Sequence, residues 1–280
     1  MQSLQKDHIT DLFVWLDDLI KDKKLVSKSK VGRPSSLTDS EITTLVIWNV
    51  LFLHQKTIQD LYNYSKMHLE SEFPNIPTYN AFLDHCHRIT GILTVLLQSM
   101  LNKKSAIKFA DSTMIEVCKL HRVDDYKVAK DLVAFGKNWQ GWHFGFKLHA
   151  AIDPSGILCS IALTPADMYD AQMLPKLNNC FTKYLIGDSH YGAKAMREYI
   201  YERDGTIILS PPHYKQRTKV ATFWQNALLS MRSKIESVYD ILKNHLNLVT
   251  SFPRSAKGYI FHYLRILIGY QIMTLSRIQS

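Results

Sequence analysis

Four side chains that can bind charged groups recur at helical spacing late in the chain. Arg232, Glu236, Tyr239 and Lys243 stand at offsets of 0, 4, 7 and 11, so a helix over residues 221–246 would carry them on one side. One acid would then lie between two bases. Such a row is often only a solvated helix face, and it gains weight only if other charged groups converge on it.

The same segment has an apolar stripe of the kind that a helix buries against a core. The stripe consists of Trp224, Leu228, Met231, Ile235, Val238, Leu242 and Leu246. Two further acids, Asp111 and Asp188, each follow a short apolar run typical of a buried strand. Taken singly, each would more often be a turn or cap residue. Together with Glu236 they have the composition of a divalent-metal site.

Three carboxylates that converge on one point repel one another unless a cation lies between them. Hard oxygen ligands suit Mg²⁺ or Mn²⁺. Two such ions about 4 Å apart can activate an attacking oxygen and stabilise a leaving one during in-line displacement at phosphorus. The three acids therefore indicate phosphodiester chemistry.

The composition is that of a folded protein with a basic excess. Of the 280 residues, 46% are hydrophobic and 21% are charged, which suffices for one large domain or two ordinary ones. Residues 1–100 carry 10 Lys plus Arg against 11 Asp plus Glu, whereas residues 201–280 carry 11 against 4. A basic excess near an acidic cluster indicates a polyanionic partner held around a metal.

Cysteine usage and hydropathy indicate a cytoplasmic protein. Four cysteines in a chain of this length give no disulfide framework, which favours a reducing compartment. No secretory signal is visible, and polar residues interrupt the apolar segment 259–273, which predicts a core helix and no membrane span. A zinc site is disfavoured because the usual paired spacing is missing; it would use His85, Cys86, His87, Cys118 and His121.

The first hundred residues predict a helical domain. Apolar residues keep helical spacing over residues 8–20. Start signals for further helices are Thr38 with Glu41, Thr57 with Asp60, and Thr78 ahead of a long helix to about residue 101. The last two of these helices would either place Tyr79, Asn80 and Asp84 near a DNA groove or simply pack together.

A turn-rich basic loop follows the first helix. It contains Lys21, Lys23, Lys24, Lys28, Lys30 and Arg33. The loop would be either a solvated linker or a phosphate-binding segment, and in the second case Lys21, Lys23, Lys24 and Arg33 are the candidate DNA contacts.

From residue 102 strand patterns replace helical spacing, and the sequence predicts an α/β fold with a mixed five-stranded sheet flanked by helices. The strands are expected around residues 107–110, 143–153, 157–163, 184–187 and 206–209, with a helix at 193–203. The second strand alternates, which predicts a half-buried strand that exposes His143, Lys147 and His149, with Lys147 as a candidate phosphate contact. The first strand would be central with the fourth beside it, which would bring Asp111 and Asp188 together.

These residues resemble a known family. The spacing of Arg232, Glu236 and Lys243 matches the Arg-x3-Glu-x6-Lys part of the Tyr-x2-Arg-x3-Glu-x6-Lys signature of bacterial insertion-sequence DDE transposases, and Asp111-Ser112-Thr113 resembles their first acidic motif. The chain is most similar to the insertion sequence 982 group. Leu229 stands where the signature has Tyr, so the role of that Tyr toward the DNA end is not carried over.

The resemblance implies an RNase H-like catalytic domain over residues 102–280, preceded by an all-α domain over residues 1–101 that binds the DNA ends. It implies Asp111, Asp188 and Glu236 as the catalytic and metal-binding triad. The implied cofactors are two Mg²⁺ or Mn²⁺ ions, with no organic cofactor.

The resemblance also implies the partners of the site. Arg232 and Lys243 would contact DNA, and Thr113, His190 and Tyr191 would be neighbours of the triad. The partner would be double-stranded DNA, both transposon ends and target, bound by a homodimer or a larger assembly in the bacterial cytoplasm.

Two hypotheses of different classes follow. The first is a transposase that hydrolyses a phosphodiester at each transposon end and uses the freed 3′-hydroxyl to attack target DNA. The second is a non-catalytic sequence-specific DNA-binding protein, either a regulator or a domesticated transposase. A plain RNase H-like nuclease is the nearest enzymatic rival. The presence of three acids favours catalysis, and the additional helical domain favours a transposase over a simple nuclease.

Overall fold

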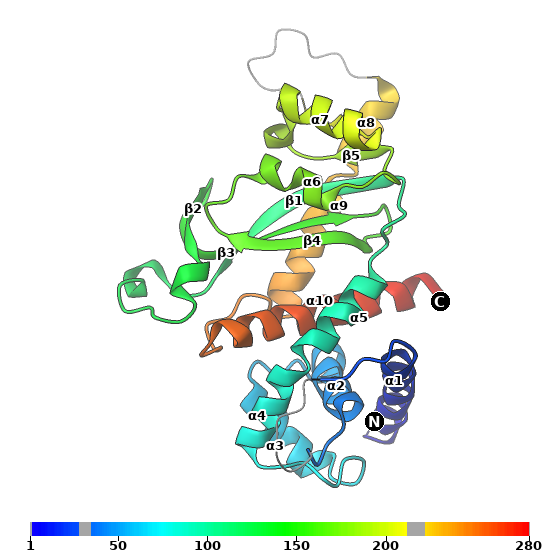
Figure 1. Cartoon of the computed structure of the whole chain (residues 1–280), viewed down its shortest axis with the longest axis vertical. Coiled ribbons are helices and arrows are strands. Elements are labelled where there is room, and N and C mark those ends of the chain that lie inside the picture. Colours follow the sequence, from blue (N-terminus) through cyan, green and yellow to red (C-terminus); the bar gives the residue numbers. More distant parts are fainter. Residues whose placement is uncertain (1, 28–34, 212–221, 280) are drawn as a thin grey trace. The chain divides into compact units, whose positions relative to one another are not determined.

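The computed structural model describes residues 2–27, 35–211 and 222–279. The chain divides into two compact units, which we call the helical unit and the sheet unit (Figure 1). The helical unit comprises Met1–Met100, Leu246–Leu248 and Phe252–Met273; the sheet unit comprises Leu101–His245, Val249–Ser251 and Thr274–Ser280. Three residues of the predicted basic loop, Lys28, Lys30 and Arg33, lie outside the described residues. None of the described helices is long and apolar enough to cross a membrane.

In the described part of the helical unit, six helices contribute buried apolar side chains to the core. The helices are α1 (Gln2–Asp22), α2 (Asp39–Trp48), α3 (Ile58–His68), α4 (Tyr79–Arg88), α5 (Thr90–Met100) and most of α10 (Ala256–Gln279). The predicted capping boxes at Thr38 and Thr57 are confirmed, because each Thr side chain accepts a main-chain N–H of the first helical turn. They satisfy groups that a helix start leaves without partners.

The single long helix expected from Thr78 to residue 101 is wrong, because this segment forms two helices. α4 ends at Arg88 and α5 begins at Thr90. The Thr90 hydroxyl donates to the main-chain carbonyl of His87 at 2.7 Å, and such a local bond competes with the helical ladder. Ile89 at the break is fully buried, so the bend is part of the core.

The C-terminal helix α10 is part of this core. The Gln271 amide donates to the carbonyl of Met100 at 2.7 Å, and the rings of His87 and Phe261 meet edge to face with centroids 6.2 Å apart. A Cβ on Gly269 would lie 2.3 Å from the side chain of Val50. Residues 252–273, which the resemblance assigned to the catalytic domain, thus pack with the N-terminal helices.

A polar network ties α2 to α4. The Asp39 carboxylate accepts hydrogen bonds from His85 Nε2 at 2.7 Å and from the main-chain N–H and hydroxyl of Ser27, both at 2.8 Å. Burial alone would raise the pKa of Asp39, but these hydrogen bonds outweigh it and lower the pKa to about 2. The charged form of Asp39 therefore stabilises the fold.

We expect Asp39→Asn to lower the free energy of unfolding by about 1.5–3 kcal/mol near neutral pH, because a charged acceptor is lost. A depressed carboxyl pKa stabilises above the unfolded value of about 3.9, and the effect disappears as the pH falls through the folded value. Urea unfolding should therefore show a smaller difference between variant and wild type at about pH 3 than at about pH 7. Asp18→Asn, at an exposed position of α1, is the control; a pH-independent difference would contradict the assignment.

The sheet unit contains a mixed sheet. Its strands are β1 (Ile107–Glu116), β2 (Ala134–Asn138), β3 (Gly141–Ile152), β4 (Leu158–Pro165), β5 (Tyr184–Ile186) and β6 (Ile207–Leu209). β3 pairs antiparallel with β1, β2 and β4, and β1 continues the sheet through the parallel strands β5 and β6. The predicted α/β class, the presence of the five strands and the pairing of the first with the fourth are confirmed, but β1 continues six residues beyond the expected end at residue 110, so Asp111 lies within the strand. β2 was not predicted, because its five residues AFGKN lack regular alternation.

The prediction that the long strand is half-buried is wrong, because helices cover both faces of the sheet. On one face, Ala110 and Ala151 pack with α6 (Leu174–Leu177) and α7 (Lys194–Asp204). On the other, α9 (Ser233–Asp240) packs against β1. Lys147 is only 8% exposed and His149 is fully buried. The alternation of apolar and polar residues therefore does not mark a solvated face here.

The helix expected over residues 221–246 is wrong as one element. Within the described residues this segment forms α8 (Phe223–Ser230), α9 and a π-helical turn (Ile241–His245). The Ser230 hydroxyl donates to the carbonyl of Ala227 at 2.7 Å, where α8 ends. Most of the predicted stripe is buried, namely Leu228, Ile235, Val238, Leu242 and Leu246, but Trp224 is exposed.

Candidate active site

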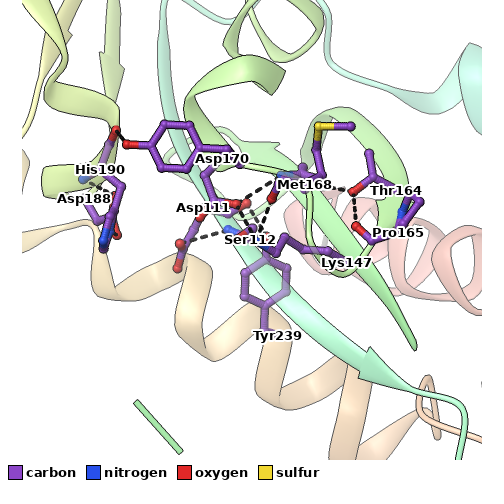
Figure 2. Close-up of polar contacts among 12 residues, drawn as sticks. Asp111, Ser112, Lys147, Thr164, Pro165, Met168, Asp170, Asp188, His190 and Tyr239 are labelled. Carbon is purple, nitrogen blue, oxygen red and sulfur yellow. Dashed lines mark hydrogen bonds and ion pairs between the residues drawn. The ribbon is translucent and has the colours of Figure 1, made fainter. Parts of the chain in front are cut away.

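A cleft of about 580 Å³ in the sheet unit collects acidic side chains from distant parts of the sequence. Asp111 comes from β1, Asp188 follows β5, and Asp167 and Asp170 come from the segment after β4. Figure 2 shows Asp111, Asp170 and Asp188 on neighbouring segments. Lys147 and Lys243 also line the cleft. The pairing of β1 with β5 explains why two carboxylates separated by 77 positions come together.

Asp111 is the most buried of the predicted acids, and its environment disfavours negative charge. Burial raises the pKa of Asp111 to about 6, and the carboxylates of Asp188 and Asp170 add to the rise. The main-chain N–H of Ser112, 2.8 Å from Oδ1, and the guanidinium of Arg232 oppose it. A cation would relieve both the desolvation and the repulsion.

Tyr239 fixes the backbone that carries Asp111. Its hydroxyl donates to the main-chain carbonyl of Asp111 at 2.6 Å (Figure 2). Tyr239 is buried, and burial raises the pKa of its hydroxyl far above the ordinary value, so the group stays protonated as a donor. The row of Arg232, Glu236, Tyr239 and Lys243 therefore includes one residue that positions β1 from within the core.

Asp188 is held by the turn that follows β5. Its carboxylate accepts the main-chain N–H of His190 at 2.9 Å and the ring Nδ1–H of the same residue at 2.7 Å. This hydrogen bond raises the pKa of His190, so the imidazole carries positive charge beside the acid up to a higher pH. His190 and Thr113, both predicted neighbours, line the same cleft.

Glu236 lies outside the lining of the cleft. Its side chain is 56% exposed, and its Oε1 is 2.9 Å from Arg232 Nη2. Arg232 Nη1 is in turn 4.0 Å from Asp111 Oδ2. A guanidinium thus connects two of the predicted acids. Among the residues that the structure describes, no three His, Cys, Asp or Glu side chains gather closely enough to hold a metal ion.

Asp170 is a cleft residue that sequence reasoning missed. It begins the 3₁₀ turn Asp170–Met173 and lies 3.3 Å from Lys147 Nζ and 3.5 Å from His149 Nδ1. Burial lowers the pKa of His149 to about 4, although Asp170 opposes the change, so the ring is neutral near pH 7. Asp170 lies in no periodic segment, and the sequence held no signal for it.

Lys147 has protein partners in place of the expected solvent exposure. Its ammonium donates to the main-chain carbonyl of Met168 at 2.8 Å and pairs with Asp170 (Figure 2). Its burial and these two contacts argue against the phosphate contact expected for it.

Other predicted residues lie at or away from the cleft. Tyr191 does not line the cleft; it is buried in the core of the sheet unit against Gly187, where an added Cβ would lie 2.6 Å from the Tyr191 ring. Lys23 and Lys24 are exposed, and Lys21 pairs with Asp17 at 2.6 Å in the helical unit. The four cysteines are free.

The comparison with known families decides the identity of the sheet unit. Residues 101–256 match a family described as "Transposase DDE domain". The match covers more than half of the chain, begins where the sheet unit begins and includes Asp111, Asp188 and Glu236. The chain belongs to this transposase family. Its mixed sheet is accordingly an RNase H-like fold, and DNA is the substrate that the family implies.

Transposase DDE domains typically work with divalent metal ions, and the residues of the cleft can be tested for that use. Asp111 and Asp188 supply carboxylate oxygens, the donors that Mg²⁺ and Mn²⁺ prefer. Burial and the nearby carboxylates of Asp188 and Asp170 raise the pKa of Asp111, and a cation bound there would favour its charged form. Asp111 and Asp188 therefore supply the type of ligand that a divalent ion requires, whereas the Glu236 carboxylate pairs with Arg232 in this structure.

Proposed function

We propose that this chain cleaves phosphodiesters at transposon ends and joins the freed 3′-hydroxyl ends to target DNA. The observation that carries the proposal is the meeting of Asp111 and Asp188 at one cleft inside a matched transposase domain. The spacing of Arg232, Glu236 and Lys243, which resembles the signature of bacterial insertion-sequence transposases, favours strand transfer over simple hydrolysis, and we propose that the chain falls in the insertion sequence 982 group. Asp111, Asp188 and Glu236 would hold two Mg²⁺ or Mn²⁺ ions, which supply Lewis-acid activation of the attacking and leaving oxygens when bound.

The chain's own residues have defined parts in this reaction. Water attacks phosphorus and the bond to the 3′ oxygen breaks; the released hydroxyl then attacks a target phosphodiester and displaces its 3′ oxygen. Asp111 is positioned by Tyr239, and Asp188 by the turn at His190. For Glu236 to act with them, its carboxylate must leave Arg232, whose guanidinium is then free to contact phosphate.

We propose that the helical unit recognises the transposon ends and that two or more copies act together, since two ends must be joined. The decisive test is incubation of the full chain with DNA that carries both ends of its own element, in Mg²⁺ and in EDTA. Cleaved ends and joined products in Mg²⁺ alone are expected. End binding without cleavage would favour the non-catalytic DNA-binding alternative, and cleavage of any duplex would favour a plain nuclease.

Lys243 offers a test of the DNA contacts. It lines the cleft, and burial lowers its pKa because the charged ammonium is poorly solvated there. A phosphate beside it would therefore stabilise the charged form. We expect Lys243→Ala to weaken binding and to reduce the slope of log K against log salt by about one. Lys194→Ala, on an 89% exposed side chain of α7, is the control and should leave the slope unchanged. An unaltered slope for Lys243→Ala would remove this residue from the DNA interface.

A further inference from the structure

The β2–β3 hairpin presents exposed aromatic side chains beside the acidic cleft. Trp139, in the two-residue turn, is 90% exposed; Trp142 is 55% exposed and Phe135 is 49% exposed. Large aromatic side chains are usually at least partly covered. Figure 1 shows β2 together with β3 in the sheet unit. Such a surface indicates a partner with flat apolar faces.

The hairpin carries these side chains in a fixed register. Phe135 pairs with Phe144 and Lys137 with Trp142, so these four residues share one face of the hairpin. Lys137 Nζ lies 5.5 Å from the centroid of the Trp142 ring, a cation–π arrangement. A cation therefore stands next to the exposed rings.

The other face of the hairpin is fastened to the sheet. His143 bonds Glu116 Oε1 at 2.6 Å through Nδ1 and Asn138 Oδ1 at 2.8 Å through Nε2. A Cβ on Gly136 would lie 2.5 Å from the carbonyl oxygen of Ala166, a close approach that glycine permits. The exposed rings are consequently presented on a supported strand pair.

The hairpin also forms one wall of the cleft. Phe135, Lys137 and Trp139 line the same space as Asp111 and Asp188. A DNA strand whose phosphate reached the two acids would therefore pass close to these side chains. Bases offer π-faces for stacking, and a nearby lysine suits their phosphates.

The geometry points to the tip of the β2–β3 hairpin as a binding site for an unpaired nucleotide next to the bond that is cut. Trp139 stacks on its base and Lys137 contacts its phosphate. The occupant is DNA and not a second protein, because a cation and a phosphodiester-binding cleft adjoin the rings. This inference rests on the proposed function, and its test separates the two.

The probe is a short duplex with a single-stranded tail of a few nucleotides that contains 2-aminopurine, compared with the same duplex whose tail is paired. Binding to the full chain is measured without divalent metal, so that no bond is cut. Wild type should prefer the tailed duplex and quench the 2-aminopurine. Trp139→Ala should lose about 5- to 150-fold in affinity for the tailed duplex only, the range expected for one stacked base. Trp139→Phe should retain most of the preference.

Tyr201→Ala, at a 61% exposed aromatic of α7 outside the cleft, is the matched control and should behave as wild type. Equal binding of both duplexes by wild type, or a full preference in Trp139→Ala, would overturn the stacking site while leaving the proposed function intact. A change of oligomeric state in Trp139→Ala with an unaltered preference would likewise overturn it in favour of a protein contact. Failure of wild type to bind either duplex would overturn both.

Discussion

Asp111→Asn, Asp188→Asn and Glu236→Gln are each expected to lower end cleavage by about 10³-fold or more. Each replaces a charged metal ligand by a neutral one of the same shape, and metal ligation supplies several kcal/mol of transition-state stabilisation. Binding of end DNA without metal should remain within a few-fold of wild type, because none of the three acids attracts phosphate. Cleavage and joining are measured on labelled ends in Mg²⁺.

Two substitutions serve as controls for these variants. Glu198→Gln on α7 and Asp240→Asn on α9 change carboxylates that are 60% and 59% exposed, similar to Glu236, and should cleave normally. Near-normal cleavage by any one of the three variants would show that this acid is wrongly assigned. The result for Glu236→Gln is the most informative, because this side chain pairs with Arg232 and does not line the cleft.

The approach of Asp111 to Asp188 could be predicted, although β1 does not end before Asp111 as the sequence suggests but continues to Glu116. Asp111 lies on β1, Asp188 follows β5, and the short apolar runs ahead of them identify buried strands. Once a mixed sheet with the first strand in the centre was expected, their approach followed from the parallel pairing of β1 with β5. Periodicity and topology together were sufficient to predict that these two carboxylates meet at one cleft.

The rest of the site depends on contacts that periodicity does not encode. Arg232 bridges Glu236 and Asp111, and Lys147 turns inward to Asp170. Both arrangements depend on contacts between side chains that are far apart in the sequence. In addition, a polar residue in an alternating strand does not indicate whether a helix covers that face of the sheet. The same limit hid β2, whose five residues become a strand only by pairing with β3.

Helix starts were predictable from capping residues, but helix breaks were missed where a side-chain hydroxyl competes for the main-chain carbonyls of the helix. The Thr-based capping boxes located the starts of α2 and α3. The breaks between α4 and α5 and between α8 and α9 coincide with Thr90 and Ser230, whose hydroxyls bond to main-chain carbonyls. Helical spacing continues across such residues, so the pattern alone predicts one helix where two form.

The packing of α10 against the N-terminal helices determines where the chain can be divided into soluble fragments. A fragment of residues 101–280 keeps α10 but loses the N-terminal helices that cover it. Its buried side chains include Tyr259, Phe261, Ile266, Leu267 and Tyr270, and their exposure would create a large apolar surface. We expect this fragment to aggregate, whereas a fragment of residues 101–251, which ends before α10, stays soluble with its sheet formed.

The two fragments also test the division of labour between the units. The fragment of residues 101–251 should bind DNA through its basic surface with little preference for transposon ends, because net charge supplies the nonspecific part of binding and placed side chains supply base readout. The full chain should discriminate end from scrambled duplexes at the same salt. Solubility is measured by sedimentation, sheet content by circular dichroism and binding by anisotropy. Equal solubility of both fragments would show that α10 does not need the N-terminal helices, and equal discrimination by the shorter fragment and the full chain would move end recognition into the sheet unit.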